Sequence, residues 1–229
     1  MRAEIRESRL KGRQAKIDEA QKFASSTKNF QDQKFQISRK IKDIREFIAL
    51  GNFAEAAELA EKVLKMDSEN AKAYTWWGIS LVKTKQLDQA IKKFLKSSRL
   101  DPGQPRTFLY WGLTLSMQKK YEEAITKYKK AIQLDPENSS AYAYWGGALT
   151  SIGNDKEAAI QLQKSLDINP FNETAYDPLV NSFYNMGQYK EAWRTVFKAR
   201  NLNVNLSGKM VERLSRAMAE PESKKDPFP

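Results

Sequence analysis

Apolar residues along the chain fall into pairs of helical stripes, with a short polar turn between the two stripes of each pair. In the stretch that begins at residue 71, the first stripe consists of Tyr74, Trp77, Gly78 and Leu81, and the second of Leu87, Ala90, Ile91 and Phe94. Both follow the i, i+3, i+4, i+7 spacing that places side chains on one face of an α-helix. The pattern predicts a helical hairpin.

The hairpin pattern recurs at a constant step of 34 residues. The segments YTWWG, FLYWG and YAYWG carry it, and small residues and prolines keep the same step: Gly78, Gly112 and Gly146; Ala90, Ala124, Ala158 and Ala192; Pro102, Pro136 and Pro170. A glycine inside a helix costs roughly 1 kcal/mol relative to alanine, so its recurrence indicates that another helix passes close by. A repeat of this length predicts an all-α solenoid of stacked helical hairpins.

At these aromatic, glycine, alanine and proline positions, the stretch from about 37 to 206 resembles the tetratricopeptide repeat family. Three units, 71–104, 105–138 and 139–172, are near the family pattern, although tryptophan replaces the usual leucine before the glycine. Two flanking units, 37–70 and 173–206, depart further from it. The resemblance implies a right-handed superhelix whose first helices line a concave groove that holds peptide segments of partner proteins.

Both ends of the chain differ from the repeats. Residues 1–36 are basic, and we expect them to be partly helical or mobile, with Ser25–Asn29 interrupting a weak apolar stripe. In the last unit Pro178 falls within the expected first helix, so a shorter helix that starts at Pro178 and is capped by Asp177 is one interpretation. Residues 207–220 predict a capping helix, and residues 221–229 a disordered tail.

Two adjacent tryptophans, Trp76 and Trp77, cannot both face one core, because neighbouring helical residues point about 100° apart. Trp77 lies on the apolar stripe, so we expect Trp76 to face the opposite side. By the resemblance, that side lines the groove, and the residues expected there are Lys72, Trp76, Ile79, Lys83, Arg106, Tyr110, Leu113, Met117 and Tyr144. The other interpretation is that the rings pack on neighbouring units and are covered within the monomer.

Composition excludes several kinds of chemistry. The chain has no cysteine and no histidine, which removes disulfides, thiolate metal sites and Ser-His or Cys-His nucleophile pairs. Carboxylate neighbours such as Glu122 and Glu123 lie along a polar helical face rather than converge in a cleft. We therefore expect a non-enzymatic protein with no cofactor and no metal.

The formal net charge of +11 is uneven along the chain. Nine basic and five acidic residues fall within 1–36, and thirteen basic and six acidic residues within 71–138. Many of the latter lie on the second helices, which the resemblance places on the convex side: Lys92, Lys93, Lys96, Arg99, Lys127, Lys129 and Lys130. A solvated surface is the simplest interpretation, and a patch for anionic lipid or an acidic protein is the alternative. Nucleic acid is disfavoured, because no nucleic-acid motif accompanies the charge.

The leading hypothesis is a protein-binding adaptor or scaffold that holds a peptide segment in its groove and helps to assemble a multiprotein complex. The expected partner segment carries apolar anchors and acidic residues. Thr75 and Ile79 stand where family members that bind chaperone tails need Lys and Asn, so that partner is not expected. The alternative is a structural subunit that forms homo-oligomers through its end repeats and N-terminal segment. An anionic membrane surface is one place where such assembly would occur. We expect a cytoplasmic location, because the N-terminus is too charged for a secretory signal.

Overall fold

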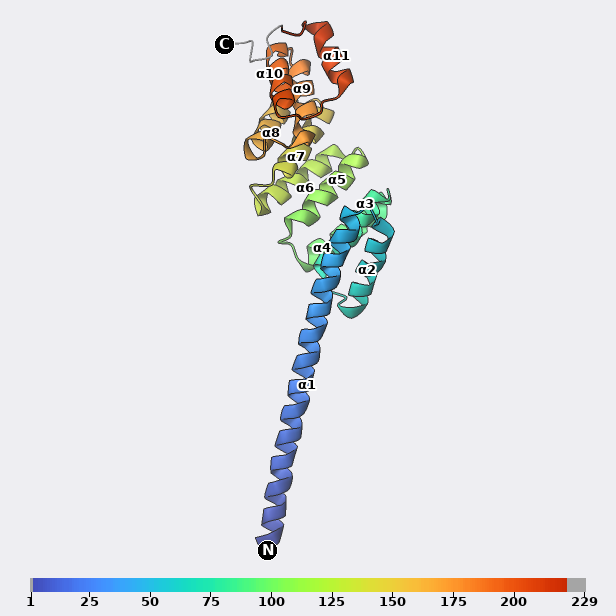
Figure 1. Cartoon of the computed structure of the whole chain (residues 1–229), viewed down its shortest axis with the longest axis vertical. Helices are drawn as coiled ribbons and strands as arrows, with labels where there is room; N and C mark the ends of the chain where they lie inside the picture. The colour runs from blue at the N-terminus through green and yellow to red at the C-terminus, as the bar shows by residue number, and fades with distance from the viewer. Residues whose placement is uncertain (1, 222–229) are drawn as a thin grey trace.

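The computed structural model describes the backbone of residues 2–221, and the side chains of residue 14 and residues 16–221. Within this range the chain forms eleven helices, stacked in antiparallel pairs into a solenoid (Figure 1). They are α1 (Arg2–Ala49), α2 (Phe53–Met66), α3 (Ala71–Lys83), α4 (Leu87–Leu100), α5 (Pro105–Met117), α6 (Tyr121–Leu134), α7 (Ser139–Ser151), α8 (Asp155–Ile168), α9 (Glu173–Asn185), α10 (Tyr189–Asn201) and α11 (Gly208–Ala217). The all-α solenoid predicted from the repeat is confirmed.

The recurring helical glycines lie where two helices of a hairpin cross. A Cβ atom added to Gly78 would lie 2.5 Å from the Phe94 ring, and one added to Gly112 would lie 2.6 Å from the Tyr128 ring. Both distances are too short for any side chain, so glycine allows the second helix of each hairpin to pack closely on the first. The close approach expected from the sequence is confirmed.

Each hairpin turn contains a residue in the left-handed backbone conformation, again at the 34-residue step. The φ angles are 83° at Gly51, 62° at Lys85, 62° at Lys119, 78° at Gly153 and 72° at Gly187. This conformation ends a helix with a tight reversal and favours glycine. Two of the five turns therefore place a lysine where the backbone is strained.

Helix α9 begins at Glu173, so the interpretation of a shorter helix starting at Pro178 is wrong. Pro178 lies within α9 and packs over Gly147 of α7, where an added Cβ atom would still be 4.0 Å from the proline ring. The Asp177 carboxylate accepts hydrogen bonds from the Ser207 backbone N–H, at 3.0 and 3.2 Å. Asp177 thus holds the start of α11, which covers the end of the solenoid through the buried Leu214.

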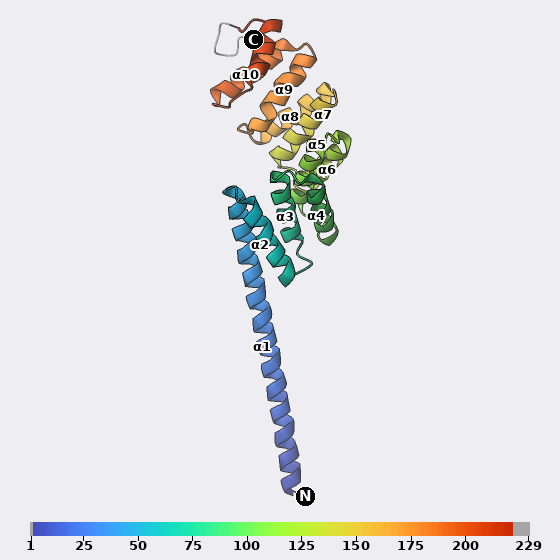
Figure 2. The ribbon, with the colours of Figure 1, turned by 90° about the vertical axis from the view of Figure 1, so that its right-hand side faces the viewer.

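Helix α1 extends as one rod from the first repeat (Figures 1 and 2). The helix runs through Ser25–Asn29, where the Ser25 and Thr27 hydroxyls donate to the carbonyls of Gln21 and Phe23, four residues earlier. These local bonds satisfy the hydroxyls within a helix. The boundary expected at residue 36 therefore falls inside a continuous helix. The expected disordered tail, 221–229, lies outside the described residues except for residue 221.

Candidate functional site

A basic, aromatic hollow lies on the first helices of the N-terminal repeats. Its volume is about 590 Å³, and α1, α3, α5 and the loops before α5 and α7 form its walls. The charged and aromatic side chains that line it are Arg45, Lys72, Trp76, Arg106, Tyr110 and Asp135. Basic groups therefore outnumber the carboxylate among the described lining residues, and the hollow suits an anionic group beside an apolar one.

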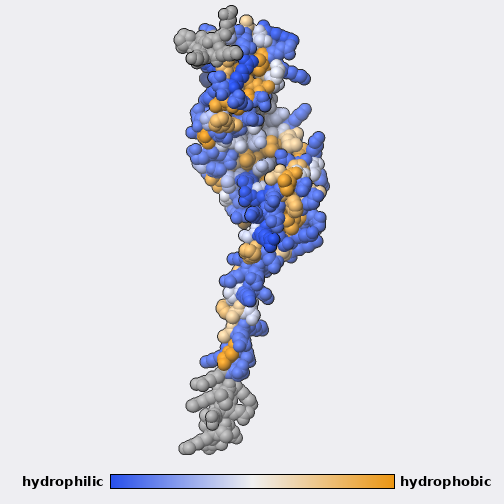
Figure 3. Space-filling view, in the orientation of Figure 1, coloured by the Kyte–Doolittle hydropathy of each residue, from blue (hydrophilic) through white to orange (hydrophobic). Residues whose placement is uncertain are grey.

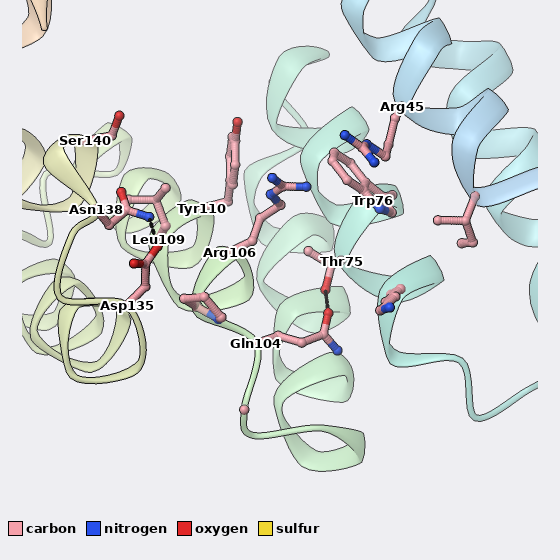
Figure 4. A pocket seen from close by; sticks show the side chains of 14 residues that line it. Arg45, Thr75, Trp76, Gln104, Arg106, Leu109, Tyr110, Asp135, Asn138 and Ser140 are labelled. Carbon is pink, nitrogen blue, oxygen red and sulfur yellow. Dashed lines mark hydrogen bonds between the residues drawn. The ribbon is translucent and has the colours of Figure 1, made fainter. Parts of the chain in front are cut away.

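Two guanidinium groups that come from different helices lie near Trp76. The Arg106 guanidinium carbon lies 4.6 Å from the centre of a Trp76 ring, and the Arg45 carbon lies 5.8 Å from one. Arg45 and Arg106 both lie beside the tryptophan, and Arg106 is placed between Trp76 and Tyr110 (Figure 4). An arginine that stacks on an aromatic face keeps its N–H donors, which lie in the plane of the guanidinium group, free to bind a carboxylate.

A cluster of three buried hydroxyls fixes the floor of the hollow. The Thr75 hydroxyl lies 2.8 Å from that of Ser97 and 2.7 Å from that of Thr107, so α3, α4 and α5 are joined at one point. The Ser97 hydroxyl also donates to the Ala71 carbonyl at 2.9 Å. Because buried hydrogen bonds in a low-dielectric site are costly to break, the cluster holds Trp76 and Arg106 at a fixed spacing.

The nine residues predicted for the groove do not form a single surface. Lys72, Trp76, Arg106 and Tyr110 line the large hollow, while Leu113 and Tyr144 line a second hollow of about 140 Å³. Lys83 and Met117 are exposed but line neither of the two. The prediction for Ile79 is wrong.

Ile79 is only 1% exposed and belongs to the core. It packs in a cluster that includes Ile48 of α1 and Tyr110 of α5. A first helix in this solenoid touches the first helices of both neighbouring repeats, so part of its outward face is also covered. A helical wheel that considers only the partner within one hairpin misses this contact.

The row of aromatic residues divides between the two interpretations offered by the sequence. Trp76 and Tyr110 are half-buried, and part of each ring packs within the molecule while the remainder lines the large hollow. Tyr144 stacks on Tyr128, with the ring centres 6.0 Å apart, and burial raises the pKa of its phenol. The packing interpretation therefore describes Tyr144 best, and an open surface is concentrated around Trp76 and Tyr110.

The tryptophan that precedes the helical glycine in each central repeat is half-buried and covered by a lysine, an arrangement that the sequence reasoning missed. Lys93 lies 3.3 Å from the Trp77 ring centre, and burial lowers the pKa of its ammonium group. Lys127 and Lys129 lie 4.0 and 4.9 Å from the ring centres of Trp111 and Trp145. Three of the seven convex basic residues therefore have a local role, which weakens the case for a lipid-binding patch. In the first two repeats the lysine follows the tryptophan by 16 residues, which was the available signal, whereas Lys129 reaches Trp145 from the preceding repeat.

Comparison with known proteins agrees with the repeat architecture. A tetratricopeptide repeat family model matches residues 115–183, and a model described as anaphase-promoting complex, cyclosome, subunit 3 matches residues 49–131. The chain is a tetratricopeptide repeat protein. A search of curated protein sequences gives no match.

Several solved structures share the fold at low sequence identity. The structure of pilF from Pseudomonas aeruginosa is 20% identical, with a TM-score of 0.73 over 82% of this chain and 86% of that one. YrrB, described as a TPR protein with an unusual peptide-binding site, is 19% identical, with a TM-score of 0.61 over 77% and 90%. MamA is 23% identical, with a TM-score of 0.61 over 75% and 95%. Among the described residues, no helix is both long enough and apolar enough to cross a membrane.

Proposed function

We propose that this protein is a non-enzymatic adaptor that binds a segment of a partner protein in the hollow around Trp76 and Tyr110. The observation that carries the proposal is the pair of guanidinium groups, from Arg45 and Arg106, that lie over the Trp76 ring system at the hollow. The peptide-binding site reported for YrrB, which has the same fold, supports it. Assembly of a larger complex follows if the solenoid holds further partners elsewhere.

The chemistry of the hollow favours a particular kind of partner segment. An apolar side chain would cover the free parts of the Trp76 and Tyr110 rings, where aromatic residues contribute most to binding. An aspartate or glutamate next to it would reach Arg106, and Lys72 at the rim adds to the positive potential. We therefore expect a peptide with one or two apolar anchors and an adjacent carboxylate.

Selection from a library of random peptides tests this proposal without a known partner. Peptides displayed on phage are selected on the wild-type protein and, in parallel, on Trp76→Ala. We expect wild-type selection to enrich sequences that combine an apolar residue and an acidic residue, and the variant to lose that enrichment. Because Trp76 is half-buried, circular dichroism and thermal unfolding of the variant confirm that the solenoid is intact. Enrichment of basic peptides, or equal enrichment on both proteins, would reject the hollow as the binding site.

A further inference from the structure

The described part of α1 before the first repeat carries an apolar stripe that no other described element covers. Phe23 and Phe30 are 75% and 56% exposed, although Lys34 lies 4.6 Å from the centre of the Phe30 ring. Hydrophobic side chains stand out along this polar rod in Figure 3. Two large exposed aromatic residues on one helix face mark an interaction surface.

The exposed stripe is a continuation of an interface that the molecule already uses. Phe23, Phe30, Ile37 and Ile44 follow one another at seven-residue steps, which keeps them within about 20° per step on one helix face. Ile37 and Ile44 pack against α2 and α3, and Ile44 is fully buried. The face that builds the first repeat thus extends, uncovered, toward the N-terminus.

The free part of this face ends near residue 33, where α2 begins to cover α1. The Gln33 side-chain amide donates to the Met66 carbonyl at 2.8 Å, which places the C-terminal end of α2 beside residue 33. A helix parallel to α1 on this face would collide with α2 beyond that point. Helices that pack through their i±4 ridges cross at about 50°, and such a crossing near residue 27 avoids α2.

We propose that the occupant is the same stripe of a second copy of this chain, so that two α1 helices cross at Thr27. The stripe is self-complementary, because the small Thr27 lies between two large rings and gives space for a ring of the partner copy. A two-fold contact requires such a patch on both subunits. The exposed stripe offers only a few side chains from each copy, whereas a stable interface takes roughly 800 Å² from each partner, so we expect the association to be weak and reversible.

Pairing of this kind would place two peptide-binding hollows in one particle. A partner protein with two suitable segments, or a partner that is itself dimeric, would then bind with greater apparent affinity than a single hollow provides. The pairing itself does not depend on the hollow. We expect Trp76→Ala to lose peptide binding and still pair. We expect a variant that cannot pair to bind a single peptide with unchanged affinity.

Sedimentation velocity over a range of protein concentrations tests the pairing. We expect the wild-type chain to move from the mass of one chain toward that of two as concentration rises, and Phe23→Glu/Phe30→Glu to remain a monomer. The matched control is Ser25→Glu/Asn29→Glu, which adds the same charges on the other side of α1 and should pair like wild type. A wild type that stays monomeric throughout, or a phenylalanine variant that pairs normally, overturns the proposal.

Disulfide cross-linking tests the position of the crossing. Because the chain has no cysteine, a single one can be introduced without removing others. Thr27→Cys should form a covalent dimer under mild oxidation, and Ser25→Cys, about 160° away around the helix, should form at least tenfold less. Equal cross-linking overturns the assigned face. Monomers that bind anionic phosphatidylserine vesicles only when Phe23 and Phe30 are present would replace the second copy with a membrane surface.

Discussion

At the scale of single residues, two adjacent glycines on α7 have different constraints. A Cβ atom at Gly146 would lie 2.4 Å from Leu162 Cγ and 3.2 Å from the Ala158 carbonyl oxygen. One at Gly147 would meet the Pro178 ring at 4.0 Å, an ordinary contact. We expect Gly146→Ala to lower the free energy of unfolding by about 1–3 kcal/mol. Gly147→Ala should raise it by up to about 1 kcal/mol through helix propensity.

Urea unfolding of the two variants, followed by circular dichroism, measures the difference. Each variant serves as the control for the other, because the substitution, the helix and the chain neighbours are almost the same. Equal changes in the two variants would contradict the close crossing of α7 and α8.

The two lysines in left-handed turns give a second prediction at this scale. Lys85 and Lys119 have φ angles of 62°, a conformation that costs a residue with a side chain roughly 1 kcal/mol more than glycine. We expect Lys85→Gly and Lys119→Gly each to raise the unfolding free energy by a few tenths to about 1 kcal/mol. The same urea titration checks this, and a loss of stability in both variants would show that the lysine side chains make compensating contacts.

Residues whose role is set by one hairpin could be predicted from the sequence. The glycines at the helix crossings are of this kind, since their step and their offset from the second apolar stripe are both visible in the chain. Ile79 and Tyr144 could not be placed, because their burial depends on helices of neighbouring repeats. Arg45 was missed for a related reason: it reaches Trp76 from α1, and no local pattern joins the two.

At the scale of elements, α1 continues through a stretch that local propensity disfavours. Ser25–Asn29 is poor in strong helix formers, yet the helix runs through it, and the Ser25 and Thr27 hydroxyls are satisfied by carbonyls of the preceding turn. Helix formation is cooperative, so the turns on either side carry the helix across a stretch that looks unfavourable residue by residue. The same holds at Pro178, which α9 accommodates against Gly147.

Three tyrosines that are wholly or partly buried predict how the stability of the fold depends on alkaline pH. Burial raises the pKa of Tyr128, and a hydrogen bond with the Ser116 hydroxyl lowers it only in part; burial also raises the pKa of Tyr144 and of Tyr176. The folded protein therefore keeps protons that the unfolded chain releases above about pH 10. Stability should be unaffected by these groups well below pH 10 and should fall as pH rises beyond it.

Replacement of Tyr128 by phenylalanine isolates this effect. The urea midpoint of Tyr128→Phe should fall less between pH 8 and pH 11 than that of the wild type. Burial lowers the pKa of Lys93, which contributes with the opposite sign as pH rises toward about 10.4, but this contribution is common to both proteins and cancels in the comparison. Identical slopes for the two proteins would contradict the assigned burial.

At the scale of the whole molecule, the solenoid separates two kinds of surface. The hollow around Trp76 is held by α1, α3 and α5 and is fixed by the buried hydroxyls of Thr75, Ser97 and Thr107. The exposed stripe of α1 lies beyond the first repeat, on the other side of the α2 terminus. Partner binding and self-association can therefore be altered independently.

The affinity of a selected acidic peptide tests the central claim most directly. Its dissociation constant is measured by isothermal titration calorimetry for the wild type, Arg106→Glu and Lys83→Glu. Both variants make the same change in net charge, but Arg106 lines the hollow and Lys83, on α3, does not. If the hollow holds the carboxylate, Arg106→Glu should weaken binding by tenfold or more, a loss of about 1.4 kcal/mol, and Lys83→Glu by less than about twofold. Equal weakening in the two variants would mean that net charge alone attracts the peptide and would contradict the proposed site.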